Sequence, residues 1–95
     1  MKIEGLIWYD EIIEKLERKH HVLQQEVREV LIGRPLFRFV ERGHRANESV
    51  YSASGRTISG RYLIVFFVLK KNNHALVISA RDMTDGEKKK FREKG

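Results

Sequence analysis

The spacing of apolar residues along the chain predicts helices in its first third. Apolar side chains recur there every three or four positions, at Ile12, Ile13, Leu16, Leu23, Val27, Val30 and Leu31. This period is typical of amphipathic helices, and the break at His20-His21 divides the segment into two. We expect Asp10 to be the N-cap of the first helix and Gly33 to end the second. Helices this short need another element to pack against.

The remaining apolar residues predict a sheet. A short first strand is expected from Ile3 to Trp8, and four more are expected at 36–40, 50–54, 61–69 and 75–80. The long apolar run after Arg61 indicates a strand that is covered on both faces, and therefore a central one. Asn72-Asn73 suits the tight turn before the last strand, because asparagine tolerates left-handed dihedral angles.

The end of the chain completes the expected fold. Thr84-Asp85-Gly86-Glu87 has the spacing of a capping box and predicts a C-terminal helix. Gly55 and Gly60 are expected to be turn glycines. The order of elements predicts an α+β fold, in which two N-terminal helices and a C-terminal helix pack on a small antiparallel sheet. A chain of 95 residues is expected to form a single domain, 1–95.

The composition indicates which cellular compartment and which class of partner to expect. The chain has no cysteine, and it shows neither a signal peptide nor an apolar run long enough for a membrane span, so we expect a cytoplasmic protein. The net charge of +6 is uneven, because residues 1–32 carry five Lys/Arg and seven Asp/Glu whereas residues 33–95 carry fourteen and six. The asymmetry favours a surface for nucleic acid or an acidic partner. A merely solvated basic surface is the alternative.

Several short segments resemble one known family. They are Lys19-His20 followed by Val22, Gly55-Arg56-Thr57, Gly60-Arg61-Tyr62-Leu63-Ile64-Val65, Ile78-Ser79-Ala80-Arg81, Glu87 and Phe91. Together they resemble the BrnT family of type II toxins, with His21 at a position where that family usually has glycine. The resemblance implies a RelE-like ribonuclease fold, an RNA substrate and a cognate antitoxin. It also implies a ribbon-helix-helix antitoxin whose dimer bridges two toxins into a heterotetramer, with DNA contacted only through the antitoxin.

The residues themselves favour RNA cleavage without a metal or another cofactor. No histidine or acidic residues have the spacing of metal ligands, and no nucleophile motif is present. Metal-free cleavage needs groups that take a proton from the 2′-hydroxyl and give one to the leaving 5′-oxygen, and cations that stabilise the reacting phosphate. The candidate catalytic residues are Arg81, Arg61, His20 and Lys19.

Each candidate also has a structural interpretation. Arg81 ends a buried strand and could grip a phosphate through two donors, or it could pair with Asp82 or Glu87. Arg61 begins the central strand and could point the same way or into solvent. His20 could transfer protons, because imidazoles titrate near neutral pH, or it could interact with its helix end. Lys19 could simply be solvated.

The remaining cations are candidates for RNA binding. They are Arg38, Arg45, Arg56, Lys88 and Lys89. Consecutive lysines spread around a helix, which favours electrostatic steering over a discrete site. Phe37 and Phe39 alternate with arginines and could stack on bases or belong to the core. His44 and His74 are expected in turns, as ordinary surface residues.

These observations lead to one main hypothesis and two alternatives. The main hypothesis is a ribonuclease toxin that cleaves RNA endonucleolytically without a metal and is neutralised by a cognate antitoxin. The first alternative is a non-catalytic RNA- or protein-binding module on the same fold. The second is a structural protein whose basic face binds an acidic protein partner.

Overall fold

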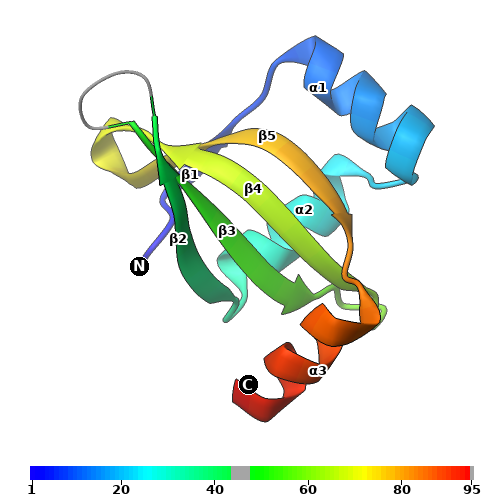
Figure 1. Ribbon diagram of the computed structural model, residues 1–95. Helices are drawn as coiled ribbons and strands as arrows, with labels where there is room; N and C mark the ends of the chain where they lie inside the picture. The colour runs from blue at the N-terminus through cyan, green and yellow to red at the C-terminus, as the bar shows by residue number, and fades with distance from the viewer. Residues whose placement is uncertain (44–47, 95) are drawn as a thin grey trace.

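The chain folds around one five-stranded sheet, as Figure 1 shows for the computed structural model, which describes residues 1–43 and 48–94. The first part contains β1 (Gly5–Ile7), α1 (Asp10–Lys15), the π-helix η1 (Leu16–His20) and α2 (Gln24–Ile32). The second contains β2 (Leu36–Arg42), β3 (Ser49–Arg56), β4 (Tyr62–Leu69), the 3-10 turn η2 (Lys71–Asn73), β5 (His74–Asp82) and α3 (Asp85–Lys94). This order confirms the predicted α+β class.

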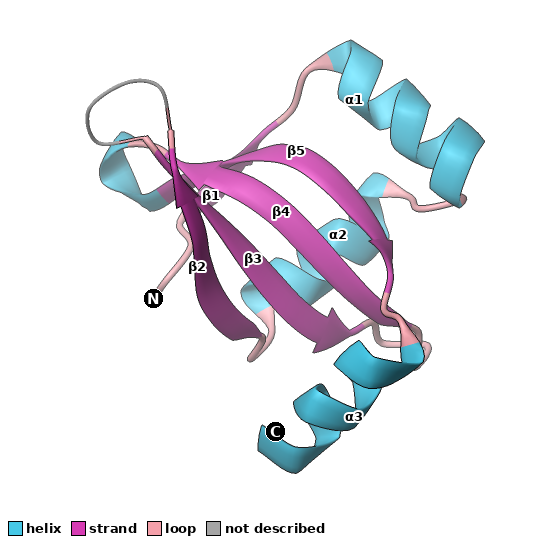
Figure 2. Cartoon of the chain, in the orientation of Figure 1, coloured by secondary structure: helices cyan, strands magenta, loops and turns pink. Residues whose placement is uncertain are grey.

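The strands lie in the order β1-β5-β4-β3-β2, which places the apolar strand β4 at the centre, as predicted. All neighbouring pairs are antiparallel except β1 and β5, which are parallel. The parallel edge was not predicted, because a strand of three residues has too short a pattern to indicate its partner. The helices between β1 and β2 cover one face of the sheet (Figure 2).

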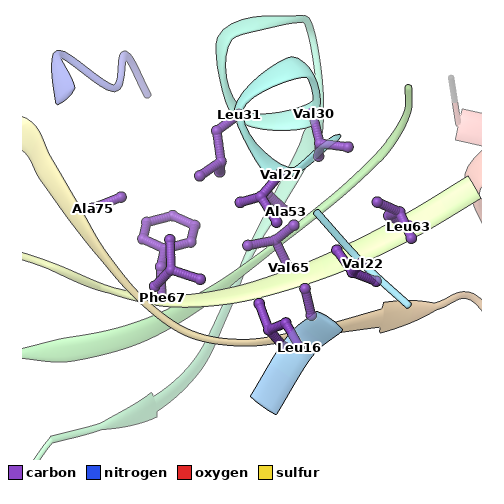
Figure 3. Packing of buried hydrophobic residues seen from close by; sticks show 12 residues of the cluster. Leu16, Val22, Val27, Val30, Leu31, Ala53, Leu63, Val65, Phe67 and Ala75 are labelled. Atoms are coloured by element: carbon purple, nitrogen blue, oxygen red, sulfur yellow. The ribbon is translucent and has the colours of Figure 1, made fainter. Parts of the chain in front are cut away.

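The core lies between that sheet face and the N-terminal helices. Figure 3 shows its side chains, which come from η1, α2, Val22 between them and the three inner strands. Val27, Val30 and Leu31 of α2 are buried, as their spacing predicts, and they face Val65 and Phe67 of β4. Because side chains alternate along a strand, Ile64 and Phe66 point to the opposite face, which the N-terminal helices do not cover.

The C-terminal helix lies at one end of this second face. Its capping box is present, since the Thr84 backbone N–H donates to Glu87 and the Glu87 backbone N–H donates to the Thr84 hydroxyl. Phe91 contacts Tyr62 edge to face, with ring centroids 6.0 Å apart. No residue of α3 is fully buried, so the helix is held by a few specific contacts rather than by a core of its own.

Three local predictions were wrong in instructive ways. The N-cap of α1 is Tyr9, and Asp10 is already the first helical residue. Leu23 does not join the core but precedes α2 and is 52% exposed. Gly55 lies within β3 rather than in a turn. A Cβ atom at this position would lie only 3.2 Å from a methyl group of Val30. Gly60 does occupy a turn, with a φ of +97°.

The π-helix η1 ends at His21, which has the left-handed conformation of an αL cap. The φ of His21 is +53°, and the Val22 N–H donates to the Leu16 carbonyl while the His21 N–H donates to the Glu17 carbonyl. The left-handed region strains residues that have a Cβ atom. This geometry explains why glycine suits the position and why a histidine there carries a conformational cost.

We therefore expect His21→Gly to stabilise the protein. Relief of the left-handed strain, about 1–2 kcal/mol, exceeds the extra unfolded-state entropy of glycine, about 0.5–1 kcal/mol, so a net gain on the order of 0.5–1 kcal/mol is expected. Urea unfolding measures it. His20→Gly is the matched control, because His20 lies within the right-handed π-helix η1 and its replacement should destabilise by about 0.5 kcal/mol. A loss of stability in both variants would contradict this account.

Candidate functional site

The candidate site lies at the end of the sheet where β3 and β5 finish and β4 begins. The β4–β5 register places Ile64 opposite Arg81 and Leu63 opposite Asp82. Arg81 and Asp82 are adjacent on one strand, so their side chains point to opposite faces of the sheet. The two arginines that the sequence singled out are therefore separated: Arg61 lies on the helix-covered face with Asp82, and Arg81 lies on the second face with α3.

Arg61 joins the sheet to the helical corner. Its Nε and Nη2 donate to the Asp82 carboxylate at 2.8 and 3.2 Å. Its Nη1 donates to the His21 carbonyl at 2.7 Å and to Glu26 at 3.1 Å, and its Nη2 donates to the His20 carbonyl at 3.0 Å. A guanidinium has five N–H donors, and these contacts use all of them. We call these residues the Arg61 cluster.

The charges of the Arg61 cluster shift each other's protonation equilibria. The hydrogen bonds from Arg61 are the largest cause that lowers the pKa of Asp82, and the nearby charges of Lys88 and His20 lower it further. In return, the hydrogen bonds to Asp82 raise the pKa of Arg61. His20 is half-buried and Lys19 is exposed. Asp82 therefore has three predicted site residues around it, namely Arg61, His20 and Lys88.

Arg81 is fixed by one carboxylate and keeps part of its guanidinium open. Its Nη1 and Nη2 donate to the two oxygens of Glu87 at 2.7 and 3.0 Å, and Nη1 also donates to the Asp82 carbonyl at 3.1 Å. In the described part of the chain, no acceptor contacts its Nε–H or the second hydrogen of Nη2. These two parallel donors, here called the Arg81 fork, belong to a side chain that is 36% exposed.

Glu87 is held ionised by this geometry. Arg81 and the Thr84 backbone N–H both donate hydrogen bonds to the Glu87 carboxylate. The hydrogen bond from Arg81 is the largest cause that lowers the pKa of Glu87, and with the Thr84 hydrogen bond and the charge of Arg81 it brings this pKa to about 2. The Arg81 guanidinium also lies 5.6 Å from the centre of the Phe66 ring. The side chain is thus oriented from two sides before any ligand arrives.

A cleft of about 260 Å³ lies beside Glu87, between α3 and the second face of the sheet. Its polar lining comes from Arg38, Ser52, Ser54, Glu87 and Lys90, and its apolar lining includes Ile64 and Phe91. Arg38 is therefore on the same face of the sheet as Arg81. Phe39 also lines the cleft, whereas Phe37 packs against Phe67 of the core.

The other predicted residues divide into two groups. Arg56 and Lys88 lie together at the end of β3, with their charged groups 4.8 and 5.8 Å from the centre of the Tyr62 ring. Lys89 is exposed on α3. His74 begins β5 and so lies at the far end of that strand. His44 and Arg45 fall outside the described residues.

Glu26 and Tyr62 were not predicted as participants, and Asp82 was expected only as a possible partner of Arg81. Asp82 and Glu26 become important only because Arg61 reaches across the fold to both. From the sequence, Tyr62 was interpreted only as part of the apolar strand. Its position at the strand end, directly after Arg61, was the signal that could have indicated a place at the site. Across residues 1–43 and 48–94, no three His, Asp or Glu side chains form a group that could hold a metal ion. No helix there has the length and hydropathy to cross a membrane.

The fold and the site define a small α+β domain with several cationic side chains at one end of its sheet. A family model described as a ribonuclease toxin, BrnT, of a type II toxin-antitoxin system matches residues 8–87. Since the match covers most of the chain, the protein belongs to the BrnT family. This membership implies an RNA target and an antitoxin partner. No curated protein matches the chain.

The depressed pKa of Glu87 makes the stability contribution of α3 acid-sensitive. A carboxyl whose folded pKa is lowered stabilises the fold above its unfolded pKa and loses that contribution as the pH falls to its folded value. Unfolding by urea should therefore become easier between about pH 4.5 and about pH 2. Glu87→Gln should remove part of this dependence, and Glu93→Gln on the same helix is the control. Identical pH profiles for wild type and Glu87→Gln would refute the assignment.

Proposed function

We propose that the protein cleaves RNA endonucleolytically without a metal ion, at the strand end that carries the Arg81 fork. The observation that carries the proposal is this fork, a pair of parallel donors on a side chain that is already oriented. Such a pair matches two phosphate oxygens, and orientation before binding makes the interaction stronger in the transition state. Arg38 and Lys90 on the same face add positive charge, which offsets the negative charge of Glu87.

The roles of the other candidates follow from their contacts. Arg61 is a positioning residue, because all its donors are engaged within the protein and it holds the His20-His21 corner through two carbonyls. His20 is the proton-transfer candidate, since its ring lies near Asp82 and imidazole suits proton transfer at neutral pH. Lys19, exposed beside it, steers the substrate electrostatically.

RNA binding extends from the site along the basic surface. Arg38 lies on β2, on one side of the cleft, and Arg56 and Lys88 lie on the other side of α3 near Tyr62. Each cation that neutralises a phosphate releases a counterion, which makes binding salt-dependent. Lys89 contributes only to the general field.

We further propose that the protein acts in the cytoplasm and that a ribbon-helix-helix antitoxin neutralises it by covering this surface. Two toxins and an antitoxin dimer would form the heterotetramer, with DNA bound only by the antitoxin. Exposed apolar side chains on the edge strand β2 support a protein partner, since Phe39 is 59% and Val40 is 45% exposed.

RNA cleavage by the purified protein in EDTA tests the proposal. We expect the wild type to cleave, and we expect Arg81→Ala to reduce the rate by about 100-fold or more, as for the loss of a transition-state donor. Lys89→Ala is the matched control and should retain most activity, because it removes a charge of no fixed geometry. A thermal unfolding curve for each variant shows whether the fold is preserved.

Two outcomes would count against the proposal. Equal losses from Arg81→Ala and Lys89→Ala would refute a discrete site at the strand end. Intact RNA together with tight, salt-sensitive binding would favour a non-catalytic RNA-binding module. One observation favours that alternative: Arg81 lies on one face of the sheet, whereas Asp82 and the nearby His20 lie on the other.

A further inference from the structure

Three cations surround one aromatic ring on the second face of the sheet. The guanidinium carbon of Arg56 lies 4.8 Å from the centre of the Tyr62 ring, that of Arg92 lies 5.3 Å away, and the Lys88 ammonium lies 5.8 Å away. Phe91 fixes the same ring from its edge. We call Tyr62, Arg56, Lys88 and Arg92 the Tyr62 cluster. Its members come from β3, β4 and α3, so the tertiary fold creates it.

In the described part of the chain, the three cations of the Tyr62 cluster form no ion pair. Arg61, by contrast, has two ion pairs and Arg81 has one, and the Asp82 carboxylate interacts with Lys88 electrostatically without forming an ion pair. The nearest internal acceptor for Arg56 is the Gly60 carbonyl, at 3.5 Å. A hydrogen bond with Arg92 is the largest cause that lowers the pKa of the half-buried Tyr62, and the positive charges of Arg56, Arg92 and Lys88 lower it further.

The ring explains how three like charges can remain together. Cations repel one another, and on flexible side chains they would separate into solvent. The face of an aromatic ring attracts each of them by about 0.5–1 kcal/mol at exposed sites. Tyr62 therefore acts as an uncharged scaffold that gathers three cations, and an anion is the ligand that such an arrangement suits.

We propose that the Tyr62 cluster is a phosphate-binding subsite that holds the RNA beside the cleavage site. This inference rests on the proposed function and adds a specific place for a second phosphate of the same strand. The recognised group is a phosphate of a polynucleotide, either an internal phosphodiester or a terminal phosphomonoester. The bound RNA would run from the Arg81 fork past Phe91 to Tyr62, since Phe91 lines the cleft and contacts Tyr62.

The test is the salt dependence of binding to an RNA oligonucleotide whose 2′-hydroxyls are methylated, so that it cannot be cleaved. For single strands, the slope of log affinity against log salt changes by about 0.7 for each phosphate contact. Tyr62→Leu removes the ring and no charge. We expect it to weaken binding about five- to tenfold at low salt and to lower the slope by about 0.7. Tyr62→Phe keeps the ring and should bind nearly as the wild type does.

Charge controls separate this subsite from a diffuse field. Arg92→Gln should lower the slope as Tyr62→Leu does, and the double variant should lose little more. Lys89→Gln removes one charge from the same helix outside the cluster and should have a smaller effect. A slope that Tyr62→Leu leaves unchanged would overturn the inference, and so would equal effects of Arg92→Gln and Lys89→Gln.

The same assay shows which kind of phosphate the subsite binds. It also shows whether a negative result rules out the subsite alone or the proposed RNA function as well. If the effect of Tyr62→Leu requires a 5′-phosphate on the oligonucleotide, the subsite holds a terminal phosphomonoester; otherwise it holds an internal phosphodiester. Tight wild-type binding with no effect of the cluster variants would overturn the subsite alone. Absence of wild-type binding would overturn both the subsite and the proposed RNA function.

Discussion

The Arg61 cluster is the interaction on which the rest of the structure depends. One side chain connects the start of β4 with the end of β5 through Asp82, with α2 through Glu26 and with the helical corner through two backbone carbonyls. These segments are far apart in the sequence, and none of the helices involved is long enough to be stable alone. Without the guanidinium, two carboxylates and two carbonyls would lose their shared donor, and the corner would lose its position over the sheet.

The alternation of side chains along β5 then gives the two arginines different tasks. Asp82 binds Arg61 on the helical face of the sheet, so the adjacent Arg81 must point to the other face. There Glu87 accepts hydrogen bonds only from the two terminal nitrogens of the Arg81 guanidinium. This division separates structural support from ligand contact at a single strand end. It also places the remaining cations, in the cleft and around Tyr62, on the face that the N-terminal helices leave open.

Much of the fold could be predicted because its patterns are local. The apolar run of β4 indicated a central strand, Asn72 and Asn73 do take left-handed angles, and the Thr84–Glu87 capping box forms. The site was harder, because its partners meet only in the folded chain. A solvated arginine and one whose five N–H donors are all engaged within the protein look alike in the sequence, as Arg61 shows. The resemblance to the BrnT family drew attention to Arg61 and Arg81, but it did not show that they lie on opposite faces of the sheet.

The central claim is that Arg81 contacts RNA and Arg61 does not. The most direct measurement follows the arginine Nε–H resonances by ¹H–¹⁵N NMR while a non-cleavable, 2′-O-methylated RNA is added, with Arg61→Lys and Arg81→Lys used to assign the two signals. The account predicts a saturable shift of the Arg81 resonance and an unmoved Arg61 resonance, because the Nε–H of Arg61 is already bound to Asp82. A shift of Arg61 with Arg81 unchanged would contradict it.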